Sequence, residues 1–362
     1  MTQHSFYMRR AITLAKQGMG FVSPNPLVGA VIVKDGHIIG EGYHARYGAL
    51  HAERNALKNC KSSPDGGDLY VTLEPCCHYG KQPPCTDAIL KSGIRRVFIG
   101  SRDPNPLVAG KGTAILQNAG IEVHPDFLRS ECDALNPIFF HYITAKMPYV
   151  ILKYAMTADG KIACAGGASK WVTGEPARSH VQQTRKRVSA VCVGIGTVLT
   201  DDPKLTCRCE NPSQPLRVVL DTHLRIPLAS ELVQTAREIP VQVFTHQPKP
   251  EKRLLLEQQG VTITEVPLEK GHVSLAAVLK QLGEQNIDSI LIEGGASIHR
   301  AALQTGLWNL LQVYIAPKIF GGDGLSPVSA MEIRDPSEAV RLSAPEITKL
   351  GEDLLLEYRR KE

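Results

Sequence analysis

The organisation of the first half of the chain is decided by residues 51–85, which read HAERNALKNCKSSPDGGDLYVTLEPCCHYGKQPPC. His51 opens this stretch, and Cys76 and Cys85 each follow a proline. One imidazole and two thiolates suit Zn²⁺, and three protein ligands leave a fourth tetrahedral position for water. The stretch therefore predicts a catalytic zinc site with His51, Cys76 and Cys85 as ligands.

Glu53 lies two positions after the histidine. Metal-bound water has its pKa lowered to about 7, and a neighbouring carboxylate can move its proton to a ring nitrogen and a leaving amine. The pattern H-x-E, then P-C and a second Cys, is typical of hydrolytic zinc deaminases, in which two residues usually separate the cysteines. Here eight residues intervene. We predict that Glu53 is the catalytic proton shuttle.

A closed structural zinc site is the alternative for the same residues. Cys77, His78 and His44 are available as a fourth ligand. Adjacent side chains point in different directions, so only one of Cys76 and Cys77 is expected to face the metal. We choose Cys76 because it directly follows Pro75.

Outside this stretch, helical and strand patterns alternate, which predicts an α/β fold in two domains. Lys146 to Pro148 suggests the boundary, because a helical stretch ends there and an apolar β-rich run begins. The expected domains are residues 1–146 and 147–362. In the first, we expect helices at 5–17, 85–92 and 112–119 and strands at 29–33, 69–73 and 95–100. In the second, we expect strands at 149–154, 190–193, 217–220, 241–244, 289–292 and 312–316.

Composition indicates an ordinary globular protein. Of 362 residues, 43% are hydrophobic and 21% are charged, and the net charge of +5 is scattered rather than clustered. This distribution favours small phosphorylated ligands over nucleic acid. No signal peptide or membrane-spanning run is expected, which favours the cytoplasm. An odd count of nine cysteines favours reduced thiols, and Cys60, Cys132, Cys164 and Cys192 are expected to be buried.

The second half contains a phosphate-binding pattern. The expected strand at 289–292 is followed by the turn Glu293-Gly294-Gly295-Ala296-Ser297 and a helix from Ile298. Backbone N–H groups at a helix start favour phosphate, and glycine allows it to approach. Gly194-Ile195-Gly196 alone is a weak dinucleotide signal.

Several motifs of the first half together resemble the deaminase half of the bifunctional riboflavin biosynthesis protein family. They are Asn25-Pro26-Leu27-Val28-Gly29-Ala30-Val31, His51-Ala52-Glu53, Thr72-Leu73-Glu74-Pro75-Cys76, His78-Tyr79-Gly80, Pro83-Pro84-Cys85, Asp103-Pro104-Asn105-Pro106 and Gly110-Lys111-Gly112. The resemblance implies a cytidine-deaminase-like domain in which Asn25 helps to hold the pyrimidine. The family usually has Ser at position 77 and a small residue at position 47, where this chain has Cys77 and Tyr47.

The second half resembles the reductase half of the same family. The motifs are Lys153, Met156-Thr157-Ala158-Asp159-Gly160-Lys161, Ser169-Lys170-Trp171-Val172-Thr173, Arg185, Gly196-Thr197-Val198, Asp201-Asp202-Pro203 and Leu205 to Arg208. The resemblance implies a dihydrofolate-reductase-like domain that uses NADPH. It implies NADPH contacts from Met156, Trp171, Thr197, Asp201, Thr222, Gly295, Ala296, Ser297, Ile298, His299, Arg300 and Ala301. It implies substrate contacts from Ser169, Arg185, Leu205, Arg208 and Glu293.

The sequence therefore predicts a bifunctional enzyme that deaminates a pyrimidine ribosyl phosphate and reduces its sugar with NADPH. The family resemblance alone implies a homo-oligomer. For the charged pair Arg185 and Arg208, charge-assisted hydrogen bonds to the substrate phosphate are expected. Three alternatives stay open: a nucleoside or tRNA deaminase with an unrelated appendage, a nucleic-acid-binding protein with structural zinc, and a regulatory protein without catalysis.

Overall fold

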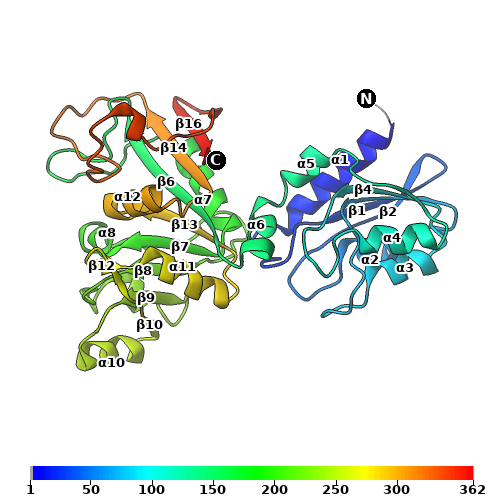
Figure 1. Ribbon diagram of the computed structural model, residues 1–362, viewed down its shortest axis with the longest axis horizontal. Coiled ribbons are helices and arrows are strands. Elements are labelled where there is room, and N and C mark those ends of the chain that lie inside the picture. The colour runs from blue at the N-terminus through cyan, green and yellow to red at the C-terminus, as the bar shows by residue number, and fades with distance from the viewer. Residues whose placement is uncertain (1–2, 362) are drawn as a thin grey trace. The chain divides into compact units, whose positions relative to one another are not determined.

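The computed structural model describes residues 3–361 and divides into two compact units, Met1–Lys146 and Met147–Glu362 (Figure 1). Within the described residues, no helix is both long and apolar enough to span a membrane.

The first unit is built around a five-stranded sheet in the order β2-β1-β3-β4-β5. Strand β1 is antiparallel to β2 and β3, whereas β3, β4 and β5 are parallel. Its elements are α1 (Gln3–Ala15), η1 (Lys16–Gly18), β1 (Gly29–Lys34), β2 (His37–Tyr43), α2 (Ala52–Lys58), β3 (Asp68–Leu73), α3 (Cys85–Lys91), β4 (Arg96–Ser101), α4 (Lys111–Asn118), β5 (Glu122–His124), α5 (Arg129–Asp133) and α6 (Pro137–Ala145).

Helices cover both faces of this sheet, because successive strand residues point to opposite faces. Val31 and Val33 of β1 pack with α1 and α5 in one core, whereas Ala30 and Ile32 pack with α2, α3 and α4 in another. Figure 1 shows α1 and α5 on one side of the strands and α2 to α4 on the other. The sheet is therefore buried on both faces, which holds the loops at its edge in fixed positions.

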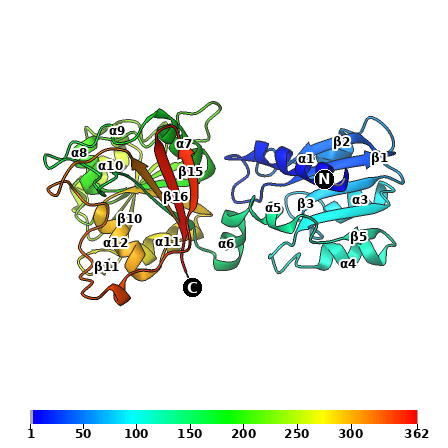
Figure 2. The ribbon, with the colours of Figure 1, turned by 90° about the horizontal axis from the view of Figure 1, so that it is seen from above.

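The second unit contains a nine-stranded sheet in the order β10-β9-β8-β7-β13-β6-β14-β16-β15. Its elements are β6 (Tyr149–Thr157), α7 (Glu175–Arg187), β7 (Ala190–Gly194), α8 (Ile195–Asp201), β8 (Leu216–Leu220), α9 (Glu231–Gln234), β9 (Val241–Thr245), α10 (Pro250–Gln258), β10 (Val261–Glu265), β11 (Leu268–Glu269), β12 (His272–Val273), α11 (Leu275–Glu284), β13 (Ser289–Gly294), α12 (Ala296–Thr305), β14 (Leu310–Ala316), η2 (Pro336–Glu338), β15 (Glu346–Leu350) and β16 (Asp353–Arg359). The strands from β10 to β14 in this order are parallel, and β16 and β15 add antiparallel pairs. Figure 2 shows β15 and β16 side by side.

The topology of the second unit decides where its ligands can bind. Strand β13 lies between β6 and β7 and is parallel to both, although it follows them far along the chain. In open parallel sheets, ligands bind beyond the carboxyl ends of strands at such a crossover point. Gly194, Thr222 and Glu293 lie at the carboxyl ends of β7, β8 and β13, so one edge of the sheet gathers them.

Two local expectations differ from the structure. Helix α12 begins at Ala296 rather than Ile298, because Gly295 has a φ of +98° and ends the strand, so that the helix starts at the next residue. Among the four cysteines expected to be buried, Cys132 and Cys192 are buried, Cys60 is half-buried and Cys164 is exposed. Cys164 lies in a surface turn, where its N–H donates to the Ala168 carbonyl, and no apolar layer covers it.

Candidate active sites

Three elements of the first unit bring His51, Cys76 and Cys85 together. His51 immediately precedes α2, Cys76 lies in the loop after β3, and Cys85 is the first residue of α3. The N–H groups of Cys85 and Thr86 donate to the Cys76 carbonyl at 3.0 and 3.2 Å, so the start of α3 is folded against the loop. The two ligand segments are therefore held together by backbone bonds.

The donor atoms of this cluster fit a tetrahedral zinc ion. His51 Nδ1 lies 3.4 Å from the Sγ atoms of both Cys76 and Cys85, and all three donors lie within 4.8 Å of one another. With ordinary Zn–N and Zn–S bond lengths, a tetrahedral angle places nitrogen and sulfur about 3.5 Å apart. Among the described residues, this is the one group of three or more His, Cys, Asp and Glu side chains with such spacing.

The alternative fourth ligands have other contacts. The Cys77 thiol donates to the Leu107 carbonyl at 3.6 Å, away from the cluster. His44 uses Nδ1 toward the Leu50 carbonyl at 3.1 Å and Nε2 toward the Asn25 amide at 3.1 Å. His78 is not part of the cluster. The geometry thus favours three ligands and an open fourth position over a closed site.

Glu53 is only 3% exposed and lies on the first turn of α2, beside the cluster. Burial, followed by the nearby Cys76, raises the pKa of Glu53 to about 7. A carboxyl group with a pKa near neutrality can both accept and return a proton at physiological pH. Its carboxyl also contacts the Cys85 side chain.

Asn25 is oriented toward this site by His44. The Leu50 carbonyl can only accept, so Nδ1 of a neutral His44 carries the proton and Nε2 accepts from the Asn25 amide nitrogen. Burial lowers the pKa of His44, which keeps the ring neutral. The His44 ring also lies edge-on to His51, with centroids 5.4 Å apart. The Asn25 side chain is thus fixed close to the cluster.

The segment 103–112, which carries the motifs Asp103-Pro104-Asn105-Pro106 and Gly110-Lys111-Gly112, is tied to the segment before Cys76. The buried carboxylate of Glu74 accepts from the N–H groups of Gly110 and Thr113, both at 3.0 Å, and from the Thr113 hydroxyl at 3.2 Å. A Cβ atom at Gly112 would lie 2.2 Å from the Pro75 carbonyl oxygen. This close approach explains why position 112 is a glycine.

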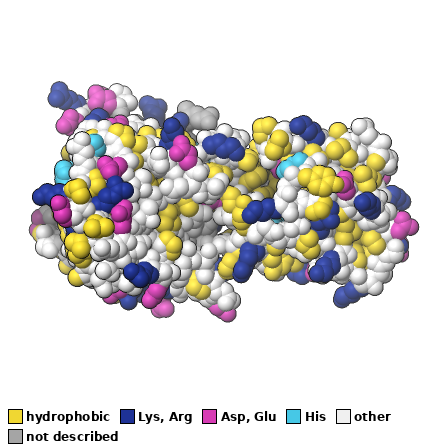
Figure 3. All heavy atoms as spheres, turned by 90° about the horizontal axis from the view of Figure 1, so that it is seen from below, with side chains coloured by type: hydrophobic (Ala, Val, Ile, Leu, Met, Phe, Trp, Pro, Cys, Tyr) yellow, Lys and Arg dark blue, Asp and Glu magenta, His cyan; other side chains and the backbone are white. Residues whose placement is uncertain are grey.

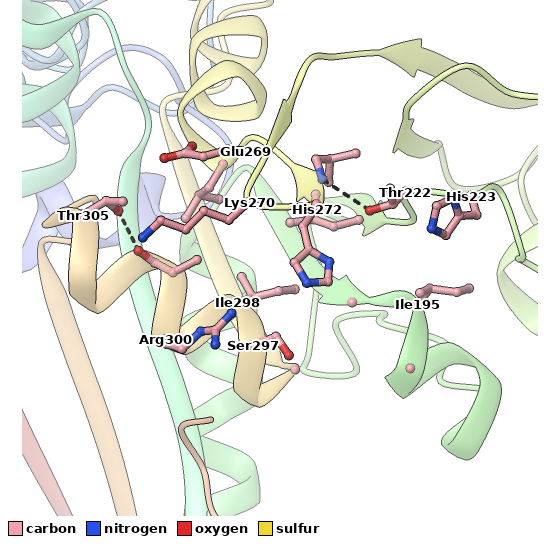
Figure 4. Close-up of a pocket in the computed structure, with 18 of the residues that line it drawn as sticks. Ile195, Thr222, His223, Glu269, Lys270, His272, Ser297, Ile298, Arg300 and Thr305 are labelled. Atoms are coloured by element: carbon pink, nitrogen blue, oxygen red, sulfur yellow. Dashed lines mark hydrogen bonds between the residues drawn. The ribbon is translucent and has the colours of Figure 1, made fainter. Parts of the chain in front are cut away.

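Two cavities of the second unit meet at Gly295, which lines both. The smaller, about 320 Å³, is lined by predicted residues of both the substrate and the cofactor sets: Ser169, Trp171, Arg185, Thr197, Asp201, Arg208, Glu293, Gly295, Ala296 and His299. The larger, about 490 Å³, is lined by Thr222, Gly295, Ser297, Ile298, Arg300 and Ala301 among others (Figure 4). Met156 and Leu205 line neither cavity, and Leu205 is buried. Trp171 is 63% exposed, so it is not a core residue.

The smaller cavity contains an ion pair that the sequence did not predict. Arg185 Nε and Nη2 donate to the two Glu293 carboxylate oxygens at 2.6 Å each, and Nη1 donates to the Thr206 carbonyl at 2.7 Å. Burial raises the pKa of Glu293, but the charge and hydrogen bonds of Arg185, together with the charges of Lys153 and Arg208, leave that pKa below its ordinary value. Glu293 occupies one edge of the guanidinium, so the exposed side chain of Arg208 is the freer cation of the two.

Lys153 is a functional candidate whose role the sequence motifs do not indicate. It lies in the middle of β6, lines the smaller cavity and interacts electrostatically with Glu293. Burial lowers the pKa of Lys153, and Glu293 opposes this shift. A lysine with a lowered pKa can donate a proton more readily than an exposed one. The only sequence signal for Lys153 is its place among the motifs that resemble the reductase half of the family.

Comparisons with known proteins follow the division into two units. Residues 1–101 match the cytidine and deoxycytidylate deaminase zinc-binding region, and residues 148–356 match the RibD C-terminal domain. The riboflavin biosynthesis protein RibD of Actinobacillus pleuropneumoniae is 52% identical over 353 residues, which cover 97% of this chain and 94% of that protein. The chain belongs to the RibD family. RibD of Escherichia coli K12 is 39% identical and covers 98% of both chains.

Solved structures of the RibD family have the same fold. Acinetobacter baumannii RibD, form 1, has a TM-score of 0.89 at 38% identity, with 99% of both chains covered. A diaminohydroxyphosphoribosylaminopyrimidine deaminase/5-amino-6-(5-phosphoribosylamino)uracil reductase from Thermotoga maritima has a TM-score of 0.88 at 40% identity and the same coverage. The predicted fold is therefore confirmed: a cytidine-deaminase-like unit precedes a RibD reductase unit. RibD proteins are bifunctional, with a zinc-binding deaminase and a reductase in one chain.

Proposed function

We propose that this chain catalyses two successive steps of riboflavin biosynthesis. The first is hydrolytic deamination of 2,5-diamino-6-ribosylamino-4(3H)-pyrimidinone 5′-phosphate. The second is NADPH reduction of the ribosyl group of 5-amino-6-(5-phosphoribosylamino)uracil to ribityl. The observation that carries the proposal is the open cluster of His51, Cys76 and Cys85 beside the buried Glu53, in a chain whose second unit has cavities suited to a dinucleotide and a sugar phosphate.

In the deaminase site, zinc would be held by His51, Cys76 and Cys85 and would supply Lewis acidity and an activated water molecule. Glu53 would take a proton from the water and deliver it to the ring nitrogen and the leaving amine. The position of Glu53, buried on the first turn of α2 beside the cluster, suits it to this role. Asn25, oriented by His44, would hold the pyrimidine through hydrogen bonds.

In the reductase site, NADPH would supply the hydride to C1 of the sugar. The residues of the smaller cavity would bind and orient the substrate, with Ser169, Arg185, Arg208 and Glu293 as its proposed contacts. Leu205, which lines neither cavity, stays a substrate contact predicted from the family resemblance. Arg208 would bind the substrate phosphate through charge-assisted hydrogen bonds. Lys153 would donate a proton at the reacting end of the sugar, because it lies in the cavity beside Glu293 and its pKa is lowered.

The remaining NADPH contacts are proposed for both cavities. In the smaller cavity they are Trp171, Thr197, Asp201, Ala296 and His299, and in the larger Thr222, Ser297, Ile298, Arg300 and Ala301, with Gly295 between them. Gly295 can lie close to a phosphate because it has no side chain. Met156 stays a prediction from the family resemblance.

The proposed partners are small molecules. On the face shown in Figure 3, Lys and Arg side chains are dispersed among hydrophobic and uncharged ones rather than gathered in one block. This supports a phosphorylated small-molecule substrate over nucleic acid. A homo-oligomer and a cytoplasmic location stay predictions. The free state of the nine cysteines is compatible with that location.

The test is a coupled assay on the zinc-loaded full chain with the diaminopyrimidine phosphate, in which ammonia release and NADPH consumption are followed separately. The wild type should show both. Glu53→Gln should lose ammonia release, by about 100-fold or more, and still reduce supplied deaminated intermediate. Lys153→Met should show the reverse pattern.

These reciprocal variants control for each other, because each leaves the other site intact. If the wild type releases no ammonia from this substrate, the deaminase assignment fails, and nucleosides and tRNA become the next substrates to assay. If Glu53→Gln abolishes both activities in a folded protein, the two sites are not independent.

A further inference from the structure

Two thiols of the second unit lie in contact beside the smaller cavity. The Sγ atoms of Cys207 and Cys209 are 3.1 Å apart, and both residues are free cysteines. An ordinary S–S bond is about 2 Å long, so the two sulfur atoms are about 1 Å from bonding distance. Arg208, which lines the cavity, is the residue between them. A bond between the two thiols would therefore act directly on Arg208.

The backbone around Cys207 is held by side chains from two other parts of the second unit. The Gln214 amide accepts from the Cys207 N–H at 3.0 Å and donates to the Cys207 carbonyl at 2.9 Å. From helix α7, the Gln182 side-chain oxygen accepts from the Arg208 N–H at 2.8 Å, and the Gln182 backbone carbonyl accepts from the Cys207 thiol at 3.4 Å. The fold thus fixes Cys207 and directs its thiol toward Cys209.

The two thiols differ in their access to solvent. Cys207 is only 2% exposed, whereas Cys209 is half-buried and can be reached by a small reagent. Burial raises the pKa of the Cys207 thiol, and the thiolate rather than the thiol is the nucleophile. Cys209 is therefore placed to react first with a small oxidant, and Cys207 to react second with the adduct at Cys209.

We propose that Cys207 and Cys209 are a redox-active dithiol pair, which a low-molecular-weight disulfide oxidises and a small thiol reduces, and that oxidation weakens the binding of the substrate phosphate by Arg208. The proposal rests on the proposed function, which gives Arg208 that role. It adds a site of reversible modification to the reductase unit.

The oxidation takes place in two thiol–disulfide exchanges. The Cys209 thiolate attacks one sulfur of the small disulfide, breaks its S–S bond and releases one small thiol. Cys207 then loses its proton, attacks the Cys209 sulfur of the mixed disulfide and releases the second small thiol, which takes up a proton. Two protein thiols are oxidised to one disulfide, and one small disulfide is reduced to two thiols.

Oxidation should move Arg208 because the bond closes a small ring around it. Cys207 is held by Gln214, so the backbone of Arg208 and Cys209 must supply the approach of the two sulfur atoms. The hydrogen bond from the Arg208 N–H to Gln182 lies in this stretch and would be distorted. A charge-assisted hydrogen bond is short, so a displacement of about 1 Å is enough to weaken it.

The experiment equilibrates the zinc-loaded full chain in glutathione buffers, from fully reduced to fully oxidised, and compares the wild type with Cys209→Ser. Mass spectrometry of peptides that span residues 207–209 detects the disulfide directly. Calorimetry gives Kd for the deaminated intermediate, and steady-state assays with NADPH give its KM. Cys164→Ser is the matched control, because Cys164 is an exposed free thiol that lines neither cavity.

We expect oxidation of the wild type to remove two hydrogen atoms from this peptide and to raise Kd and KM for the intermediate by about fivefold or more. Reduced glutathione should reverse both changes. Cys209→Ser should bind like the reduced wild type in every buffer, and Cys164→Ser should respond as the wild type does.

Two results would overturn the inference: no disulfide between Cys207 and Cys209 in glutathione disulfide, or a disulfide that leaves Kd and KM unchanged. If Kd responds to oxidation as expected but NADPH does not reduce the intermediate, the inference stands and the proposed reduction fails.

Discussion

Two adjacent thiols, Cys76 and Cys77, face different parts of the first unit. Cys76 lies 3.4 Å from His51 Nδ1, whereas Cys77 donates to the Leu107 carbonyl. Because only Cys76 has metal-ligand geometry, Cys76→Ser should lose zinc and reduce deaminase activity by more than about 100-fold. Cys77→Ser should keep one zinc per chain and most of its activity. Elemental analysis of the purified variants measures this, and zinc loss in Cys77→Ser alone would contradict the assignment.

The ion pair between Arg185 and Glu293 is a second feature at the scale of single residues. Its side chains are 10% and 9% exposed, so Glu293→Gln would leave a buried guanidinium without its counter-charge. We expect a loss of about 3 kcal/mol in the free energy of unfolding, measured by denaturant titration of the full chain. Glu257→Gln is the control, because Glu257 pairs with Arg253 at the surface and should lose less than about 0.5 kcal/mol.

The same pair predicts a pH dependence. The pKa of Glu293 in the folded protein lies below its ordinary value of 4.5. Ionised Glu293 therefore stabilises the fold above pH 4.5, and this contribution is lost as the pH falls through the lowered pKa. Between pH 6 and about pH 3, the wild type should therefore lose more stability than Glu293→Gln does. Parallel stability curves for the two proteins would contradict the lowered pKa of Glu293.

At the scale of elements, the first turn of α4 positions the loop after β3. Gly112 of α4 lies against the Pro75 carbonyl, next to Cys76, and a Cβ there would lie 2.2 Å from that oxygen. Gly112→Ala should displace the ligand loop and reduce deaminase activity by about tenfold or more, with reductase activity unchanged. Gly166→Ala is the control, since nothing lies within 4 Å of its Cβ position. Unchanged ammonia release in Gly112→Ala would mean that the loop yields without moving Cys76.

Elements with strong patterns could be predicted from the sequence, and weakly patterned ones could not. Strands β1, β3 and β13 are runs of buried apolar residues, and each was expected within two residues of its observed ends. Strand β15 was not expected, because its residues are almost all exposed and pairing with β16, rather than burial, holds it. The two-residue strands β11 and β12 are too short to show any period.

The residues of the two sites also divide into those that the sequence pattern predicts and those that it does not. The chemistry of His51, Glu53, Cys76 and Cys85 is readable from residue types, since few combinations suit a catalytic zinc ion. Contacts between distant segments cannot be read from the sequence. Arg185 and Glu293 are 108 positions apart, and Arg225 and Lys270 line one cavity only because the segment after β8 is joined to the β11–β12 hairpin in the fold.

At the scale of the whole molecule, each unit has hydrophobic cores of its own. The clusters around Tyr70 and Val71 belong to residues 1–146, and those around Leu152 and Tyr314 belong to residues 147–362. Each unit also contains all the residues proposed for its own reaction. These two facts predict that the chain can be divided at Lys146.

Residues 1–146 and 147–362, expressed separately, should each fold cooperatively. The first fragment should release ammonia at a rate within about threefold of the full chain, and a zinc chelator should abolish that activity. The second should reduce supplied deaminated intermediate with NADPH and be insensitive to the chelator, because none of the proposed zinc ligands lies in it. Circular dichroism melting checks folding, and the two assays check function. If a fragment folds but is inactive, its site requires residues from the other unit, and independence of the two reactions is refuted.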